Sequence, residues 1–368
     1  LIADGISTLT LNPMLYQPYK IQTDDGRDTI VYGKIPVDRL AEGTVQYFLE
    51  DGTPLKEGKY RTTDLSKSEQ GFYVTANGLK SDVFKVSIRE PFAEDAYETI
   101  TYPVVFHLIQ DKTKVELGQG VGADIVNYAF NTIYNCFART AAFSPNGADT
   151  KIRFRLAEYD PNGRKMEEKG INRYSLSTSD LNNLNPEKIK NNPKICWDYK
   201  RYLNIWIVEN MGNSVSTPHY ILNTADLNQI QGVSFEQLSL EEIEKQEYSL
   251  TDIGLIYGAR DFAIEDVGYP TQMGKFFGLL DTENQKEDYC EDTFAYNTYK
   301  EPWNTALEGS NSRLKISTDG LIFYSVNIMD ASSYKNTISM DQVKRIRTIT
   351  DNCPHRWAWK SDWAFTGK

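Results

Sequence analysis

The hydrophobic period of the sequence changes near residue 100, and this change constrains the fold more than any other feature. From Leu1 to about residue 90, short runs of Val, Ile, Tyr, Phe and Thr alternate with turn residues at intervals of roughly ten. Beyond Pro103 an apolar run, Val104 to Ile109, precedes a helical stripe formed by Ile125, Ala129, Ile133 and Phe137. Because the two periods occupy separate parts of the chain, they predict an all-β domain followed by an α+β domain.

Residues 1–95 are predicted to form an immunoglobulin-like β-sandwich. The expected strands are Thr29–Tyr32, Val45–Leu49, Phe72–Thr75 and Val83–Ile88. Asp51-Gly52 and Asn77-Gly78 follow two of them and favour tight turns. No segment in this part predicts a helix.

Residues 96–368 are predicted to form the second domain, with an upper subdomain at about 103–278 and a lower one at about 279–368. Ile152, Phe154 and Leu156 alternate as in a half-buried strand, and Leu203–Val208 is continuously apolar, as in a buried one. Ser239 with Glu242, and Ser339 with Gln342, have the capping-box spacing that begins a helix. The fold class predicted for the whole chain is therefore α+β.

Composition excludes several classes of partner. The formal charge of −11 disfavours a nucleic acid or an anionic lipid surface, since both need clustered Lys and Arg. No apolar run approaches the roughly 18 residues needed to cross a bilayer. The chain begins at Leu1 rather than Met, which suggests an upstream segment removed by processing or by cloning.

Cysteines and histidines are few. Cys136, Cys196, Cys290 and Cys353 are even in number and widely spaced, so they fit either disulfides or separate buried thiols. No two of the three histidines stand at helical metal-ligand spacing. His107 lies in an apolar run and is expected to be a hydrogen-bonded structural residue, whereas His219 and His355 are expected at the surface.

The segment Pro270-Thr-Gln-Met-Gly-Lys-Phe-Phe-Gly-Leu-Leu-Asp-Thr282 carries the functional argument. It keeps the spacing of the zinc-protease pattern H-E-x-x-H-x-x-G-x-x-H around Gly278. Thr271 and Lys275 stand at the two helical ligand positions, Gln272 at the general base, and Asp281 at the third ligand. A protonated lysine offers no lone pair to zinc, and an amide cannot act as a carboxylate base.

A second motif supports the same alignment. Asn327-Ile-Met-Asp330 resembles the methionine turn that lies under the zinc of metzincins. The other matching segments follow in family order: Pro103-Val-Val-Phe-His-Leu-Ile109, Ile152-Arg-Phe-Arg-Leu-Ala157, Leu203-Asn-Ile-Trp-Ile-Val208, Cys290-Glu-Asp-Thr293 and Asp341-Gln-Val-Lys-Arg-Ile-Arg347.

Over residues 103–350 the chain resembles the pappalysin-like metzincins, particularly those of secreted or lipid-anchored bacterial proteins. The resemblance implies a zincin-type catalytic domain, zinc as the family's cofactor, and a groove for extended peptides. It also implies export to the periplasm or outer surface of a bacterium and a lipid anchor upstream of Leu1. Family members often carry a tyrosine two residues after the turn methionine, and Ala331 stands there.

The departures predict a metzincin-like pseudopeptidase that binds no zinc, has no catalytic residues, and holds a polypeptide in the former active-site cleft. One alternative is an active metalloendopeptidase with non-standard ligands such as Asp281 and His219. Another is a cell-surface adhesion protein acting through residues 1–95. The plainest alternative for residues 271–282 is a buried amphipathic helix ending at Gly278, unrelated to any protease.

Two finer hypotheses concern charge and aromatic residues. The Lys275 ammonium is expected to pair with Asp281 near the vacated metal position, because unpaired buried charges are costly. The C-terminal residues Trp357, Trp359, Trp363 and Phe365 either pack across the body or, if exposed, bind a peptide or sugar.

Overall fold

The structure is a computed structural model that describes residues 1–35, 37, 40–140, 142–263, 268–282, 287–298, 314–318, 322–330 and 335–368. It is a mixed α/β, sheet-rich structure, which divides into two compact units. The first contains residues 1–94 and the loop 143–147, and the second contains most of the remaining chain. Each unit is described below on its own.

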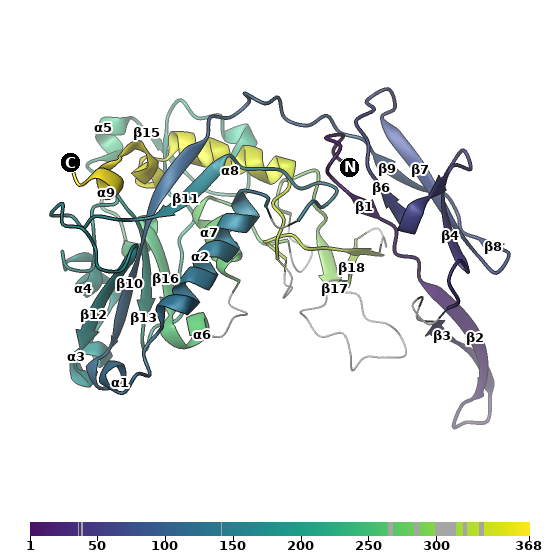
Figure 1. The fold of residues 1–368 in the computed structure, drawn as a ribbon, viewed down its shortest axis with the longest axis horizontal. Coiled ribbons are helices and arrows are strands. Elements are labelled where there is room, and N and C mark those ends of the chain that lie inside the picture. Colours follow the sequence, from purple (N-terminus) through teal and green to yellow (C-terminus); the bar gives the residue numbers. More distant parts are fainter. Residues whose placement is uncertain are drawn as a thin grey trace. The chain divides into compact units, whose positions relative to one another are not determined.

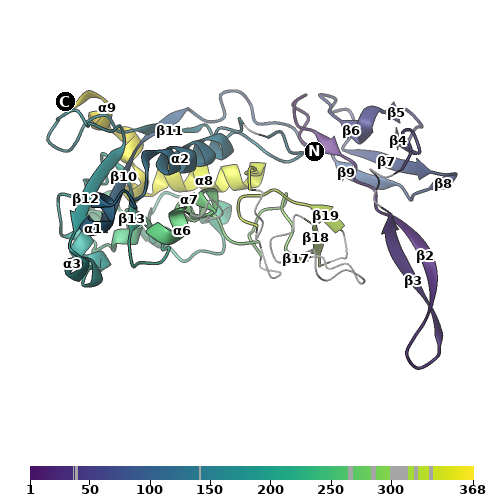
Figure 2. The ribbon, with the colours of Figure 1, turned by 60° about the horizontal axis from the view of Figure 1, so that its bottom comes forward.

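The described part of the first unit consists of strands and loops, with no α-helix (Figure 1). An antiparallel five-stranded sheet has the order β5-β4-β7-β8, with β9 also paired to β7. β1 pairs with β6, and β2 with β3 forms a separate hairpin (Figure 2). The strands are β1 Leu9–Thr10, β2 Leu15–Gln22, β3 Asp28–Ile35, β4 Val45–Leu49, β5 Pro54–Leu55, β6 Lys59–Tyr60, β7 Glu69–Ala76, β8 Leu79–Lys80 and β9 Phe84–Ser87.

The predicted strand positions in this unit lie within β3, β4 and β7, and most of Val83–Ile88 lies in β9. The loop 143–147 joins the unit through the amide of Ile2, which donates to the Pro145 carbonyl at 2.8 Å. An immunoglobulin-like sandwich stays a prediction, because one five-stranded sheet and two strand pairs do not establish that topology.

A parallel sheet forms the centre of the second unit, in the order β11-β10-β13-β16. The long strand β10 pairs with β11 along its first half and with β12 along its second. The strands are β10 Ile100–Asp111, β11 Ile152–Leu156, β12 Ile171–Leu176, β13 Leu203–Val208, β14 Tyr220–Leu222, β15 Glu236–Leu238, β16 Gly254–Gly258, β17 Tyr296–Thr298, β18 Leu314–Ser317 and β19 Ile322–Tyr324. β13 is buried throughout, as its apolar run predicts.

Helices surround this sheet. They are α1 Lys112–Glu116, α2 Ala123–Phe137, α3 Thr178–Asn182, α4 Pro186–Lys190, α5 Leu240–Ile243, α6 Ala259–Ala263, α7 Tyr269–Phe276, α8 Met340–Asn352 and α9 Trp363–Thr366. α2 buries Ala129, Ile133 and Phe137 of the predicted stripe, and it packs beside α7 (Figures 1 and 2). Both capping boxes are present, at the starts of α5 and α8. Within the described residues no helix is long and apolar enough to span a membrane.

The C-terminal tail is folded rather than extended, so the tryptophans do not alternate across a strand. Two 3-10 turns, Pro354–Arg356 and Ala358–Lys360, precede α9. Trp363 and Phe365 pack against a cluster containing Val105, Trp197 and Tyr202. Packing of the tail across the body is thereby confirmed for these two aromatic residues.

The four cysteines are free thiols, and three of them are buried. Burial raises the pKa of the Cys136 thiol to about 12 and that of Cys196 to about 11. Of the sequence alternatives, the structure therefore has separate thiols.

The three histidines have different environments. His107 is fully buried, with Nε2 2.9 Å from Asn204 Oδ1 and Nδ1 2.9 Å from Asn172 Nδ2, so its structural role is confirmed. The side chain of His219 is 54 % exposed. The surface position expected for His355 is wrong, because this residue is buried among Tyr199, Tyr220 and Tyr248.

The buried histidines predict a loss of stability in acid. Burial lowers the pKa of His107 from 6.5 to about 4, with the Asn204 hydrogen bond acting in the opposite sense. Between those two pH values the unfolded chain binds a proton that the folded chain does not, so stability falls as pH drops from 6.5 to 4. For a fully buried group the loss is on the order of 3 kcal/mol.

Urea unfolding of the wild type and of His107→Gln at several pH values between 7 and 4 measures this effect. Glutamine keeps an amide donor and acceptor but does not titrate, so we expect a shallower pH dependence for the variant. An identical pH dependence for both proteins would contradict a neutral, buried His107.

Candidate functional site

The helix α7 carries the segment that the sequence singles out. It begins after Gly268, has Pro270 in its first turn, and ends before Gly278, whose φ is +83°. A side chain in this left-handed region is strained, and a Cβ at position 278 would lie 3.0 Å from Ile349 Cγ1 of α8. Gly278 therefore lets the chain turn sharply at the end of the helix, close against α8.

The loop Asn327–Asp330 packs directly on α7. A Cβ at Gly274 would lie 2.8 Å from Met329 Sδ, so a larger residue there would displace the Met329 side chain. Asn327 shapes the loop, because its Oδ1 accepts from the Met329 amide at 2.9 Å and its side-chain amide exchanges hydrogen bonds with Gln342 of α8. The two motifs that the sequence predicted as partners are thus in contact.

Thr271 links the helix to that loop through its hydroxyl. The hydroxyl donates to the Ile328 carbonyl at 2.6 Å and accepts from Lys335 Nζ at 2.9 Å. Its donor and one acceptor position are therefore used within the protein. A cation already stands beside the first of the predicted ligand positions.

Lys275 and Asp281 form an ion pair, which confirms the predicted pairing. Lys275 Nζ donates to Asp281 Oδ2 at 3.0 Å, and their side chains are 30 % and 36 % exposed. The second and third ligand positions are therefore joined to each other by an ammonium–carboxylate hydrogen bond. At this exposure the pair adds only about 1 kcal/mol or less to stability.

Asp330 and Thr282 form a buried pair beneath the turn. The Thr282 hydroxyl donates to Asp330 Oδ1 at 2.5 Å. Burial raises the pKa of the Asp330 carboxyl, while hydrogen bonds from Ser325 and Thr282 and the charges of Lys315 and Lys335 lower it. This carboxyl contributes to the packing of the turn and stands next to Met329.

The remaining predicted positions are Gln272, Ala331 and His219, of which Gln272 and His219 make none of the contacts between α7 and the Met329 loop described above. Gln272 is half-buried on α7; its backbone amide donates to the Gly268 carbonyl at 3.2 Å, and its side chain makes no hydrogen bond within the part of the chain that the structure describes. Ala331, expected to follow the turn, lies outside the described residues. His219, proposed as an unusual ligand, places Nδ1 2.9 Å from Asp252 Oδ1.

Zinc does not fit this set of side chains. Zinc takes neutral imidazole, thiolate or carboxylate ligands, whereas Lys275 places an ammonium group at the second ligand position and Lys335 places another beside Thr271 at the first. Over residues that the structure describes, no three His, Cys, Asp or Glu side chains group in a metal-binding arrangement.

Sequence reasoning missed the residues that hold the end of α7. Arg345 of α8 is buried and donates from Nε to the Gly278 carbonyl at 2.5 Å and from Nη1 to the Gln231 carbonyl at 2.6 Å. Lys335 was missed as well. Both lie more than 60 residues from their partners. Arg345 belongs to the matched segment Asp341–Arg347, but nothing in that segment indicates which carbonyls it reaches.

No protein-family model matches this chain, and no curated protein does either. Among solved structures it is similar to a promirolysin variant of Tannerella forsythia, at 18 % identity and a TM-score of 0.45, covering 73 % of this chain and 85 % of that one. Mature mirolysin of Tannerella forsythia in complex with a cleaved peptide gives 17 % identity, a TM-score of 0.45, and coverage of 73 % and 97 %. Mirolysin in complex with compound 9 is 18 % identical with a TM-score of 0.46, and the match covers 73 % of this chain and 98 % of that one. TM-scores of this size establish neither a family nor an activity.

Gly278→Ala is expected to destabilise the second unit by about 2 kcal/mol or more, because alanine adds left-handed strain and a close contact with Ile349. Gly118→Ala is the matched control, since Gly118 has φ +70° in the same unit but open space around its Cβ position. Urea unfolding of both variants separates backbone strain from the contact. Equal losses would show that α7 does not press against α8 at this point.

Proposed function

We propose that the second unit is a metzincin-type domain that has lost its zinc site and serves as a pseudopeptidase that binds a polypeptide. The observation that carries the proposal is the Lys275–Asp281 ion pair on a helix that turns at Gly278 above Met329. The spacing of a metal-binding helix is kept, while the ammonium group supplies at that position the positive charge that a metal would bring.

The substituted residues remove the chemistry of hydrolysis as well as the metal. A hydrolytic base must accept a proton from the attacking water, and the amide of Gln272 has no basic site for it. Thr271 is hydrogen-bonded to Ile328 and Lys335 and is not available as a ligand. In this proposal the domain holds a chain without cutting it, by strand addition and side-chain contacts.

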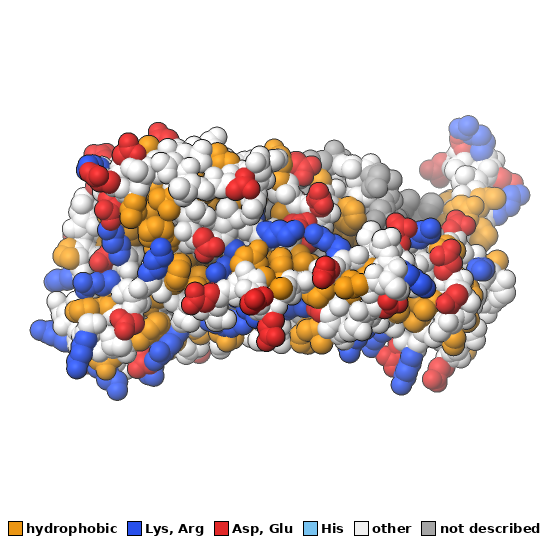
Figure 3. Space-filling view, turned by 90° about the horizontal axis from the view of Figure 1, so that it is seen from above, with side chains coloured by type: hydrophobic (Ala, Val, Ile, Leu, Met, Phe, Trp, Pro, Cys, Tyr) orange, Lys and Arg blue, Asp and Glu red, His pale blue; other side chains and the backbone are white. Residues whose placement is uncertain are grey.

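The cellular location of the protein and the role of its first unit are proposed on the resemblance alone. The protein is exported to the periplasm or bacterial surface, and its first unit is a spacer or adhesion module. The acidic charge of −11 agrees with a protein partner rather than a nucleic acid. On the face shown in Figure 3, acidic and basic side chains are interspersed, without a broad basic field.

Equilibrium dialysis against micromolar zinc, followed by elemental analysis, tests the loss of the metal site. We expect close to zero zinc per chain for the wild type and for Lys275→Ala. The combined variant Thr271→His, Gln272→Glu, Lys275→His and Asp281→His restores the ligand pattern and should hold one zinc per chain.

Two results would contradict the proposal. One tightly held zinc in the wild type would mean that other residues form a metal site. A combined variant that folds, by circular dichroism, but takes up no zinc would mean that α7 and the Met329 turn lack metzincin geometry.

Labelled casein measures binding and cleavage in one sample. We expect saturable binding by fluorescence anisotropy, with no new fragments after long incubation and no effect of a chelator on the fragment pattern. Fragments that disappear when a chelator is added would restore the metalloprotease alternative.

A further inference from the structure

The first residues of β10 leave one edge of that strand open. The Ile100 amide donates to the Lys151 carbonyl at 3.0 Å, towards β11. Because successive residues of a strand direct their backbone groups to opposite edges, the N–H and C=O of Thr101 face away from β11. On that side β13 begins to pair only at Val104. Across the described residues, the backbone groups of Thr101 thus have no strand partner.

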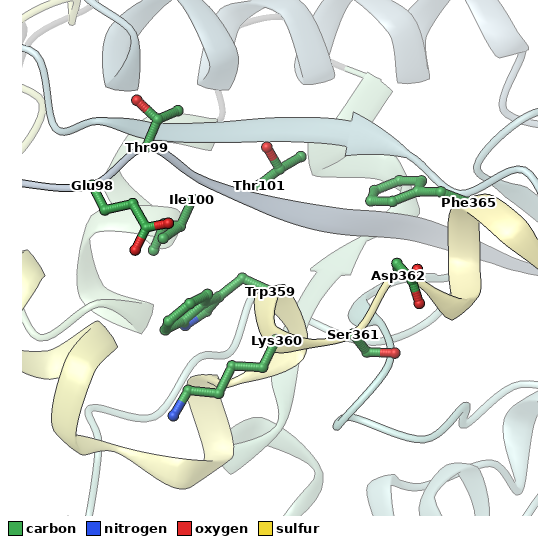
Figure 4. A pocket seen from close by; sticks show the side chains of 9 residues that line it. All are labelled: Glu98, Thr99, Ile100, Thr101, Trp359, Lys360, Ser361, Asp362 and Phe365. Atoms are coloured by element: carbon green, nitrogen blue, oxygen red, sulfur yellow. The ribbon is translucent and has the colours of Figure 1, made fainter.

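A pocket of about 540 Å³ lies at this open edge, wholly within the second unit (Figure 4). Glu98 and Thr101 line it from the strand, and Trp359, Asp362 and Phe365 line it from the C-terminal tail. We call it the β10 pocket. It combines unpaired backbone groups with two aromatic side chains, and it shares no residue with the α7 site.

The charge of the β10 pocket is negative. Neither Glu98 nor Asp362 makes a side-chain hydrogen bond or ion pair in the described structure. The ammonium group of Lys360, which also lines the pocket, lies 3.1 Å from the centroid of the Trp357 ring, and Figure 4 shows it directed away from Asp362. Arg155 covers the Phe365 ring but is paired with Glu158. Two carboxylates therefore remain for a cationic ligand.

We propose that the β10 pocket binds an extended peptide that carries an arginine or lysine. The peptide backbone adds to the open edge at Thr101, as in other cases of strand addition. Its basic side chain enters the pocket and pairs with Asp362, next to Phe365, while Glu98 at the other end of the pocket adds to the negative charge (Figure 4). Phosphate-bearing ligands are disfavoured by the same carboxylates, and the acidic chain as a whole attracts a basic peptide.

The test uses the full chain and a fluorescein-labelled peptide, Gly-Thr-Val-Arg-Val-Thr-Gly, with binding followed by anisotropy at low and moderate salt. We expect saturable binding that weakens with salt. Replacing the peptide's arginine by glutamine, or methylating the backbone nitrogens on either side of it, should weaken binding about tenfold. The protein variant Glu98→Gln with Asp362→Asn should weaken it by a similar factor.

The matched control is Glu236→Gln with Glu247→Gln, which removes two exposed carboxylates elsewhere on the second unit and should leave binding unchanged. Lys275→Met with Asp281→Asn should also leave peptide binding unchanged. Binding at the β10 pocket is thereby tested independently of the function proposed for the α7 site. Absence of saturable binding, equal losses in the control, or insensitivity to backbone methylation would overturn the proposal. Displacement of the peptide by maltotriose would do so too, since it would indicate a sugar site.

Discussion

Two buried guanidinium groups hold the end of α7, and the geometry of the candidate site depends on them. Arg345 donates to the carbonyls of Gly278 and Gln231, and Arg356 donates to those of Phe276, Asp252 and Ser216. Burial lowers the pKa of both arginines, which shows the desolvation cost of placing them there. Hydrogen bonds from charged donors to carbonyls left free at a helix end offset part of that cost.

The positions around this anchored helix are held by ionic and hydrogen-bonded pairs. A zinc site closes through several short bonds to one central ion, whereas Lys275 with Asp281, and Lys335 with Thr271, are separate pairwise contacts. Such contacts at partly exposed positions hold side chains in place without much stabilisation. Stability near the site must then come from packing, to which Gly274 on Met329 and Gly278 on Ile349 contribute.

β10 runs from the β10 pocket into the core of the second unit. Its central residues lie in the core of the sheet, paired on both edges, while its first residues pair only with β11. A strand that extends beyond its neighbour exposes unpaired backbone N–H and C=O groups. In proteins such an edge is covered by another segment, protected by charged or proline residues, or used to bind another chain. The aromatic tail leaves a pocket at this edge, so the C-terminal residues both pack on the body and line a surface.

The sequence by itself determined the local elements, because hydrophobic periodicity and capping spacing are properties of neighbouring residues. Periodicity placed α2 and the strands β10, β11 and β13, and side-chain spacing placed the capping boxes of α5 and α8. The motif around Gly278 also predicted the Lys275–Asp281 pair, because it places the two charges six residues apart and an unpaired buried charge is costly. The burial of His355 and the folded form of the tail escaped it, because both depend on segments distant in the chain.

Only the tertiary structure decided what surrounds those motifs. Lys335 reaches Thr271 across 64 residues, Arg345 reaches Gly278 across 67, and the tail meets β10 from more than 250 residues away. Such contacts depend on how sheet, helices and tail pack together, and a single sequence carries no local pattern for them. The order of the motifs came from the sequence, and their meeting in one site came from packing.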